Sequence, residues 1–400
     1  MLFRDIMKPV VAHSVDIYLP ITCHWIYCQL LNVKRFETVV VARQKQNLDL
    51  FPLSNVYSLE DFSEIGEFVQ KVRRKLRNSH YPFWEKVLRK RNAKLLHSHF
   101  GNRGYHNLGL AKRLKIPHIA SFYGFDLNML PQRDPVWKER YQTLFNECDL
   151  FLVEGNHAKK YLVDMGCSEE KIVVQHLGVN LEDIEFVPRE TNGTGTINIL
   201  VAGSFREKKG IPFALEAFGL MREKHKNLRM VLIGDSSGIP REEAEKKKIS
   251  EVIKRRGLND SIKMLGFVPY SELMAEASRC HIFLSPSIQA SDGDTEGGAP
   301  VTILEMSASG MPVLSTFHCD IPGTVLNGKS GFLVPEKDVG ALAEKLDYLI
   351  SNPKIWIEFG KSGRDHTARN YNSKIQAKKL EAIYDKLLSR FSSGLQSNLL

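Results

Sequence analysis

One loop of the sequence combines acidic, glycine and proline residues in the order expected of an anion site. It opens the segment Ser291–Pro312, which reads S-D-G-D-T-E-G-G-A-P-V-T-I-L-E-M-S-A-S-G-M-P. Gly297 and Gly298 let the backbone approach a ligand closely, because neither carries a side chain. Pro300 suits the first position of a helix, and the apolar periodicity of Val301–Ser309 predicts that helix. The segment therefore predicts a loop that leads into a short helix.

The start of this helix would attract a phosphate group. The free N–H groups around Ala299–Thr302 and the helix dipole both favour negative charge. Glu305 lies in the second helical turn, where its carboxylate could accept hydrogen bonds from sugar hydroxyls. Glycines and a proline are equally compatible with an ordinary capped surface helix, so these residues alone leave both interpretations open.

A cluster of cations follows a second glycine turn. The apolar run Ile197–Ala202 predicts a strand, and the chain continues as G-S-F-R-E-K-K-G over residues 203–210. A strand, a glycine turn, cations and a helix together form a common phosphate site at the edge of a parallel sheet. Arg206, Lys208 and Lys209 would supply the positive charge, although a solvated basic turn would have the same composition.

The order of these features resembles the donor-site motif of the family 4 glycosyltransferases, which are retaining enzymes with the GT-B fold. A glutamate, a small glycine loop, a proline, an apolar run, a second glutamate and Gly-x-Pro-Val occur in that order in both. The resemblance implies that Glu305 binds the ribose of a nucleotide-sugar, while the loop backbone and Glu296 meet the diphosphate and the donor sugar. The family usually has seven residues between the two glutamates and this chain has eight, so only Glu305 is in clear register.

The same resemblance assigns roles to the cationic turn. In the family the turn reads Gly-Arg, several residues, then Lys-Gly; Gly203 and Lys209 match, whereas Ser204 replaces the arginine. We expect Arg206 to supply the missing charge, because its planar fork suits phosphate. Lys209, Arg206 and Glu296 are therefore the expected catalytic residues. The two cations and the helix N-terminus would neutralise the diphosphate as it leaves.

Further donor positions follow from the resemblance. Phe267 and Val268 lie in L-G-F-V-P-Y, which matches the family segment whose backbone meets the nucleobase, although core packing explains both equally well. Asp292-Gly-Asp294 matches the D-x-D with which other glycosyltransferases bind Mn²⁺ or Mg²⁺, but it lies late in the chain, in the loop before the motif. We therefore expect no metal and no other cofactor, with Asp294 beside Glu296 at the sugar hydroxyls. The expected donor-binding residues are Gly203, Ser204, Phe267, Val268, Asp294, Gly297, Gly298, Ala299, Pro300, Val301 and Glu305.

The first half of the chain is expected to face the acceptor and the sugar. His99 and the segment S-F-Y-G-F-D, residues 121–126, each end a predicted strand. The segment resembles Thr-x-His-Gly-x-Asp of the family, with Asp126 at the acidic position and Tyr123 in place of the histidine that normally touches the donor sugar. Tyr123 could hydrogen-bond that sugar but could not act as a cation. His99 is assigned to the same side, although a histidine at a strand end is more often structural.

Two alternating series of strands and helices must position these residues. Short apolar runs alternate with amphipathic segments over residues 1–185 and again over 186–372, with a Pro-, Gly- and Thr-containing stretch between them. Such alternation predicts α/β domains with doubly wound parallel sheets. Two Rossmann-like domains of this kind facing a central cleft form the GT-B architecture. By resemblance, residues 186–372 bind the donor, and a C-terminal helix over about 373–392 packs back on the acceptor-binding first domain.

Composition and charge are those of an ordinary globular protein that is basic. The chain has 400 residues, of which 43% are hydrophobic, and a formal net charge of +9. It contains no apolar run long enough to cross a bilayer and nothing that reads as a signal peptide. Its six cysteines form no C-x-x-C pair and no cluster at metal-binding spacing. These features predict a cytoplasmic protein with reduced thiols.

The basic charge is concentrated in Lys71–Lys94. This stretch contains ten Lys or Arg residues and one acid, with Tyr81, Phe83 and Trp84 among them. Such a segment could lie on anionic lipid headgroups at the inner face of the membrane. A solvated helix pair whose aromatics belong to the core explains the same residues. Nothing else in the chain supports nucleic-acid binding, so we expect none.

We therefore expect a retaining, metal-independent glycosyltransferase that moves a sugar from a UDP- or GDP-sugar to a polysaccharide or glycolipid acceptor, for example a lipid-linked one. Two alternatives share the architecture, namely a nucleotide-sugar epimerase or hydrolase and a non-catalytic nucleotide-sugar-binding partner subunit. The departures at Ser204 and Tyr123 favour the subunit, whereas Lys209 and Glu305 oppose it. Fold alone does not separate these functions.

Overall fold

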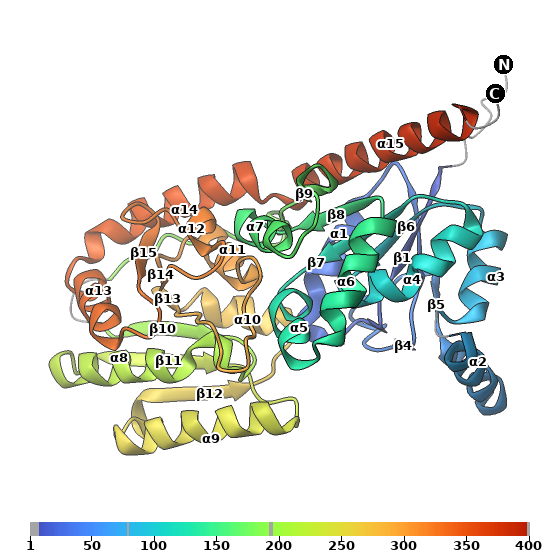
Figure 1. The fold of residues 1–400 in the computed structure, drawn as a ribbon. Helices are drawn as coiled ribbons and strands as arrows, with labels where there is room; N and C mark the ends of the chain where they lie inside the picture. Colours follow the sequence, from blue (N-terminus) through green and yellow to red (C-terminus); the bar gives the residue numbers. More distant parts are fainter. Residues whose placement is uncertain (1–7, 78–79, 192–194, 398–400) are drawn as a thin grey trace. The chain divides into compact units, whose positions relative to one another are not determined.

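The chain forms two compact α/β domains. The computed structural model describes residues 8–77, 80–191 and 195–397. The first domain comprises Met1–Gly178 together with Ser373–Leu400, and the second comprises Val179–Asn372. Each domain is built on its own parallel sheet (Figure 1), as the strand–helix alternation predicted.

The first domain is built on a seven-stranded sheet in the order β5-β3-β1-β6-β7-β8-β9. Every neighbouring pair in it is parallel, and helices connect most of the consecutive strands, although the chain passes from β3 to β5 without one. A separate short pair, β2 and β4, lies beside it. The strands are β1 (Val10–Ser14), β2 (Ile17–Tyr18), β3 (Glu37–Val41), β4 (Gln44–Lys45), β5 (Val56–Tyr57), β6 (Ala93–His99), β7 (His118–Phe122), β8 (Leu150–Val153) and β9 (Ile172–Val174).

Helices cover both faces of this sheet. Because side chains alternate along a strand, neighbouring residues of one strand reach opposite faces. Ala12 of β1 packs with Trp84 and Leu110, whereas Val11 packs with Leu380 and Tyr384. Figure 1 shows the last of these helices, α15, running beside the strands of the first domain. The helices are α1 (His24–Asn32), α2 (Glu64–Arg77), α3 (Pro82–Lys90), α4 (Gly101–Leu114), α5 (Leu130–Arg133), α6 (Val136–Glu147), α7 (Asn156–Asp164) and α15 (Ser373–Ser397).

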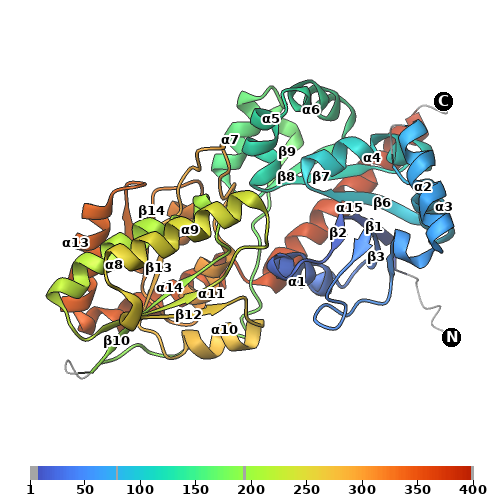
Figure 2. The same cartoon turned by 90° about the horizontal axis from the view of Figure 1, so that it is seen from below.

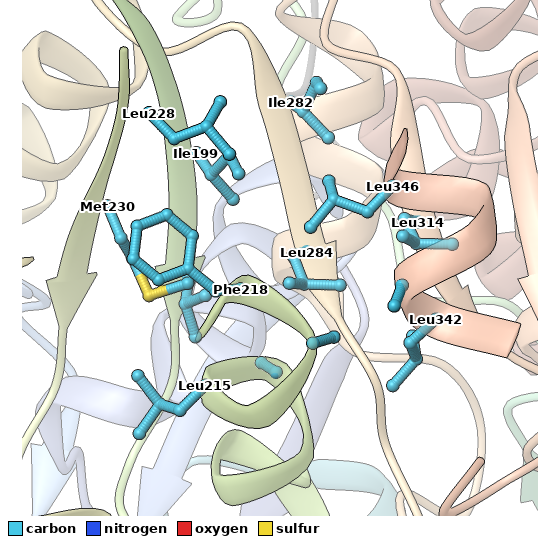
Figure 3. Packing of buried hydrophobic residues seen from close by; sticks show 14 of the residues in the cluster. Ile199, Leu215, Phe218, Leu228, Met230, Ile282, Leu284, Leu314, Leu342 and Leu346 are labelled. Carbon is cyan, nitrogen blue, oxygen red and sulfur yellow. The ribbon is translucent and has the colours of Figure 1, made fainter. Parts of the chain in front are cut away.

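The second domain has a six-stranded parallel sheet in the order β12-β11-β10-β13-β14-β15. Figure 3 shows one side of its core, where the ring of Phe218 from α8 lies beside Met230 and Leu346 from α13 points toward the strand that carries Leu284. The strands are β10 (Ile197–Ala202), β11 (Leu228–Ile233), β12 (Ile262–Gly266), β13 (Ile282–Ser285), β14 (Val313–Thr316) and β15 (Gly331–Val334). The helices are α8 (Ile211–Lys224), α9 (Pro240–Arg255), α10 (Tyr270–Ala277), α11 (Val301–Ala308), α12 (Ile321–Thr324), α13 (Val339–Ser351) and α14 (Trp356–Asn370).

The chain passes into the second domain earlier than the sequence predicted. We had placed the boundary after residue 185, whereas the structure divides the chain after Gly178. The physical reason is a small apolar cluster. Val179 and Ile184 are buried there against Leu304 and Tyr371, all of which belong to the second domain. Residues 192–194 of the predicted linker lie outside the described part of the chain.

Among the residues that the structure describes, no helix is both long enough and apolar enough to cross a membrane. Figure 2 shows the same helices from below.

The contact between α15 and the first sheet yields a stability prediction. Leu380 is fully buried against Val11 and Leu95, so Leu380→Ala leaves a cavity. We expect it to lower the free energy of unfolding by about 2–5 kcal/mol. Lys379 is exposed on the same helix, and Lys379→Ala should leave stability nearly unchanged. Urea unfolding followed by circular dichroism would measure both, and equal losses would show that the α15 face contributes nothing specific.

Candidate active site

Two loops of the second domain meet at the carboxyl ends of β10 and β13. The first runs from Gly203 through a short 3₁₀ turn to Gly210, where α8 begins. Gly210 has a positive φ of 62°, and a Cβ atom there would lie 1.9 Å from the carbonyl oxygen of Pro286. Only glycine therefore lets the first loop pass so close to the end of β13. The N–H of Ile288 donates to the carbonyl oxygen of Lys208 at 2.8 Å and joins the two loops.

Cations of the first loop pair with carboxylates of the second. Lys209 Nζ lies 3.0 Å from Glu296 Oε1. The buried Lys208 reaches both acids, with its Nζ 3.5 Å from Asp294 Oδ1 and 3.6 Å from Glu296 Oε2. Arg206 forms an ion pair with Asp294. Three cations thus face two carboxylates, which leaves an excess of positive charge where the sequence predicted a phosphate site.

The lysines keep Glu296 ionised although its side chain is only 5% exposed. Burial alone would raise the pKa of this carboxyl group, but Lys209 and Lys208 outweigh burial and lower the pKa to about 2. For Lys208 the balance goes the other way, because burial lowers the pKa of its ammonium group more than the two acids raise it. The cluster therefore holds Glu296 as a fixed carboxylate. Beside it lies Lys208, whose charge the neighbouring acids only partly neutralise.

A second set of polar groups orients Glu296, and the sequence analysis did not assign it. Ser287 Oγ donates to Glu296 Oε1 at 2.9 Å. The backbone nitrogen of Glu296 lies 3.2 Å from His318 Nε2, and Nδ1 of the same ring lies 2.7 Å from Glu336 Oε1. Lys208 also donates to the carbonyl oxygen of Thr295 at 2.7 Å.

One signal could have revealed these residues. Ser287, His318 and Glu336 each stand within two residues of the carboxyl end of a strand, namely β13, β14 and β15. These three strands are neighbours in the sheet, and ligands of open parallel sheets bind at that edge. The sequence showed each strand, but not that the three were adjacent.

The loop then enters helix α11. Gly297 has a positive φ of 76°, and Gly298 accepts a hydrogen bond from the N–H of Asp320 at 3.1 Å. The sequence predicts Pro300 as the first residue of this helix. In the structure the helix begins at Val301, and Pro300 is the residue before it. No side chain caps this end. The N-terminus next to Ala299 is thus built as an anion site would require.

Glu305, predicted to bind ribose, is buried in the second turn of α11 and is only 5% exposed. Burial raises the pKa of its carboxyl group to about 8, and a hydrogen bond from Tyr270 offsets part of that shift. Glu305 is therefore mostly protonated at neutral pH in the ligand-free protein. A protonated carboxyl group can both donate and accept a hydrogen bond, as a pair of sugar hydroxyls would need.

The remaining predicted donor residues are more open. Phe267 is 44% exposed just beyond β12, where its ring is free to cover a base, whereas Val268 packs partly against the core. Gly203 and Ser204 are half-buried at the end of β10. Lys209 lies directly over Gly203, so a Cβ atom there would meet the lysine side chain at 3.4 Å. The first loop therefore presents backbone and Lys209 together.

The two aspartates of the D-x-D do not converge. Asp292 is paired with Arg241 at 3.4 Å, and its second oxygen accepts a hydrogen bond from the N–H of Asp294 at 3.1 Å. The carboxylate of Asp294 is buried and points instead to Arg206 and Lys208. In this arrangement the two carboxylates are held by different cations.

The predicted acceptor-side residues of the first domain contact one another. His99 Nδ1 lies 2.8 Å from the hydroxyl oxygen of Tyr123, and its Nε2 lies 3.1 Å from His13 Nδ1. Asp126 accepts hydrogen bonds from the N–H groups of Gly101 at 2.6 Å and Tyr123 at 3.0 Å. All of these side chains are buried. Asp126 therefore holds the loops after β6 and β7 in place.

Burial determines the protonation of this cluster. It lowers the pKa of His99 to about 3 and raises that of Asp126 to about 6, the latter against hydrogen bonds from backbone N–H groups that lower it. His99 is therefore neutral, and it can only exchange hydrogen bonds with Tyr123 and His13. In this conformation neither His99 nor Tyr123 is exposed to an acceptor.

Three buried histidines of the first domain have ring nitrogens within 4.8 Å of one another, namely His13, His97 and His99. Their orientation does not suit a shared metal. The rings of His97 and His99 are stacked at 4.5 Å with an interplanar angle of 19°. Both nitrogens of His97 already have partners at 2.7 Å, Tyr384 and Ser121. Metal ligation uses lone pairs in the ring plane, and stacked rings do not direct theirs at one point.

Comparison with known proteins places this geometry in a family. The family model of glycosyl transferases group 1 matches residues 183–366, and that of glycosyltransferase family 4 matches residues 33–183. The amylovoran biosynthesis glycosyltransferase AmsK of Erwinia amylovora is 30% identical over 294 residues, which cover 72% of this chain and 69% of AmsK. The chain belongs to glycosyltransferase family 4.

Other relatives agree with this assignment. The putative colanic acid biosynthesis glycosyltransferase WcaL of Escherichia coli K12 is 35% identical over 255 residues, which cover 62% of this chain and 59% of WcaL. The chain thus spans less than two thirds of WcaL. A glycosyltransferase from Rickettsia africae matches 95% of this chain and 99% of its own, with a TM-score of 0.74 and 18% identity. Anabaena HepE, solved with UDP and glucose, matches 95% of this chain and 100% of its own, with a TM-score of 0.74 and 14% identity. The two structures confirm the GT-B fold of this member of family 4.

The buried carboxyl group of Glu305 predicts a pH-dependent stability. Its pKa is about 8 in the folded protein against 4.5 for an ordinary glutamate, so the folded state binds more protons than the unfolded state between these values. Stability contributed by this group therefore falls as pH rises from about 4.5 to 8. Glu305→Gln removes the titration, and we expect the variant to gain stability over the parent by several kcal/mol between pH 5 and pH 8.

Melting temperatures of both proteins at the two pH values would measure this gain. Glu344→Gln, at an exposed position of α13, is the matched control and should change neither curve. A constant difference between Glu305→Gln and the parent across this range would contradict a buried neutral carboxyl group.

Proposed function

We propose that the chain is a retaining glycosyltransferase that moves a sugar from a UDP- or GDP-sugar to a polysaccharide or glycolipid acceptor. The observation that carries the proposal is the cation cluster Arg206, Lys208 and Lys209 around Glu296, next to the uncapped start of α11. Family membership supports glycosyl transfer. The names of WcaL and AmsK support exopolysaccharide as the product, and HepE, crystallised with UDP and glucose, supports a nucleotide-sugar donor.

The chemistry that this cluster suits is departure of a diphosphate. As the bond between the anomeric carbon and the diphosphate breaks, negative charge grows on the leaving oxygen and positive charge on the sugar. Lys209, whose side chain is 19% exposed, can turn from Glu296 to the diphosphate. Arg206 Nε is buried without a hydrogen-bond partner, so a phosphate oxygen there would satisfy it. Preorganised cations of this kind stabilise developing charge because they need little rearrangement.

Glu296 and Glu305 would then have different tasks. Glu296 is ionised and held by Ser287, so it can accept hydrogen bonds from the donor sugar and stabilise its positive charge. Glu305 carries a neutral carboxyl group and suits the ribose hydroxyls. Phe267 offers an exposed ring and nearby backbone to the base. Retention of the anomeric configuration follows from the family resemblance and is part of the proposal.

We expect no metal in the reaction. The reason lies in the residues, because Asp292 pairs with Arg241 and Asp294 with Arg206, while the diphosphate has cations of its own. Two other functions of the same fold predict different outcomes. An epimerase or hydrolase would release sugar without an acceptor, and a non-catalytic subunit would bind nucleotide without any turnover.

The acceptor and the location of the protein remain part of this proposal. A lipid-linked acceptor would bring the chain to the inner face of the membrane as a peripheral protein of the cytoplasm. Binding to nucleic acid is not expected.

The first experiment identifies the donor. Thermal unfolding of the protein with UDP, GDP, ADP and their sugars should show a rise in melting temperature with either the UDP or the GDP series, because a ligand of the folded state stabilises it by mass action. The preferred sugar nucleotide, radiolabelled in the sugar, is then incubated with membrane lipid extract. Transfer of label to lipid or polymer supports the proposal, and release of free sugar alone or no turnover would contradict it.

Lys209 and Lys208 should give contrasting variants. Lys209→Gln is expected to lower turnover by about a hundred- to a thousandfold, because it removes a preorganised cation from the leaving group. The fold should survive, since Lys209 is partly exposed. Lys208→Met should instead lower the melting temperature, because Asp294 and Glu296 lose a buried partner. Turnover and melting curves measured together would separate the two effects. Equal turnover of Lys209→Gln and the parent would exclude Lys209 from the chemistry.

The metal prediction has a direct assay. Sugar transfer should continue at an unchanged rate after treatment with EDTA and gel filtration. A loss of activity that Mn²⁺ restores would assign a metal role to Asp292 and Asp294 and would overturn the proposed use of the cations.

A further inference from the structure

Helix α2 exposes its apolar side chains to solvent. Ile65, Phe68 and Leu76 are 78%, 66% and 81% exposed, and Val69 and Val72 are each more than one third exposed. Figures 1 and 2 both show α2 at the edge of the first domain, beside α3. A soluble helix ordinarily turns such residues inward, so this surface is the unusual feature of the domain.

These residues form one stripe. At about 100° per residue, Ile65, Phe68, Val69, Val72 and Leu76 fall within an arc of roughly 100° around the helix axis. The stripe is therefore continuous along the whole helix.

Cations border the stripe on both sides. By the same helical geometry, Arg73 lies on one flank and Lys75 on the other, each roughly 80° from the centre of the stripe. Lys71 lies further round on the Lys75 side and pairs with Glu67 at 2.6 Å. All three cations are exposed.

The polar face of α2 is the one that contacts the protein. Gln70 Oε1 accepts a hydrogen bond from the N–H of Phe83 at 3.3 Å, and the guanidinium of Arg74 lies 5.0 Å from the ring centre of Tyr81. The helix is thus fixed with its apolar stripe facing outward. Rotating it to bury the stripe would break both contacts.

The structure also corrects the sequence-based membrane hypothesis for Lys71–Lys94. The three aromatics of that stretch, Tyr81, Phe83 and Trp84, are buried in the core and cannot reach a bilayer. Arg89 is paired with Glu85, and Arg91 with Glu37. The sequence showed charge and aromatics in one stretch, but the packing of α3 uses them inside the domain.

We propose that α2 docks the first domain on an anionic membrane surface. An exposed apolar stripe with a cation on each flank has the distribution of an interfacial helix, which inserts its apolar face at the level of the headgroups and meets anionic lipid with its flanking cations. Charge complementarity selects this occupant, because Arg73 and Lys75 are exposed on the two flanks of the stripe, whereas Glu64, which lies on the Lys75 flank, is at the other end of the helix, eleven residues from Lys75. The docking surface rests on this geometry alone. Its use in delivering a lipid-linked acceptor rests on the proposed function.

The experiment measures binding of the protein to vesicles. Equal parts of phosphatidylglycerol and phosphatidylcholine form the anionic vesicles, and pure phosphatidylcholine forms the neutral ones. We expect sedimentation with the anionic vesicles, weakened by high salt. The variant Ile65→Gln/Phe68→Gln/Leu76→Gln should bind at least a hundredfold more weakly, and glutamine keeps the helix propensity. The variant Arg73→Gln/Lys75→Gln should lose about fivefold per cation at low salt.

Matched variants control for general changes of charge and polarity. Lys86→Gln/Lys90→Gln removes two exposed cations from neighbouring α3, and Leu50→Gln/Val136→Gln/Ile239→Gln removes three scattered exposed apolar side chains. Both should bind anionic vesicles nearly as well as the parent. Melting temperatures with UDP and GDP should stay the same for every variant, so a failure of docking is distinguishable from a failure of donor binding.

Two outcomes would overturn the proposal. The parent protein does not bind anionic vesicles, or the α2 glutamine variant binds them as well as the parent. In the second case, a parent that is a dimer in analytical ultracentrifugation and an α2 variant that is a monomer would make the stripe a contact between two copies.

Discussion

The second domain depends on one buried cation. Lys208 is almost excluded from water, and an unpaired ammonium group there would cost several kcal/mol. Its position is tolerable only because Asp294, Glu296 and the carbonyl oxygen of Thr295 surround it. The loop after β13 must therefore follow the loop after β10, and Glu296 and the start of α11 follow with it. Electrostatic contacts therefore position the site at the carboxyl edge of the sheet. Apolar packing alone would not hold the two loops together there.

Local patterns of this site could be read from the sequence, whereas the contacts between its distant residues could not. The strands, the glycine turns, Lys209 and Glu305 were visible because each is a local pattern. The roles of Lys208, Ser287, His318 and Glu336 depend on contacts between residues 9 to 88 positions apart. Such contacts follow from strand order and register, which periodicity does not reveal. From the sequence, the planar guanidinium favours Arg206 over Lys208 as the cation that meets phosphate. In the structure the two side chains differ in burial, because Lys208 is the more deeply buried.

The same reasoning applies to the first domain. His99, Tyr123 and Asp126 follow neighbouring strands β6 and β7, so their proximity was predictable, but their burial beneath Trp25 and beside His13 was not. For α2 the heptad-like spacing shows an apolar stripe, yet spacing does not say which way a stripe faces. That direction was decided by Gln70 and Arg74, which are ordinary surface residues by type. Orientation is a property of the whole domain, and it becomes visible only when the neighbouring helix is placed.

The division of the first domain between two distant parts of the chain bears on how the protein is made. Tyr384 of α15 hydrogen-bonds His97 of β6 across 287 positions, and Leu380 and Leu387 cover Val11 and Leu95 of the same sheet. During translation the strands of the first sheet leave the ribosome long before α15 exists, so one apolar face stays uncovered while the second domain is synthesised. The second domain, Val179–Asn372, is continuous and can complete its own core first. Order of folding would then be the reverse of order of synthesis, and the nascent chain would need protection from aggregation on that one face.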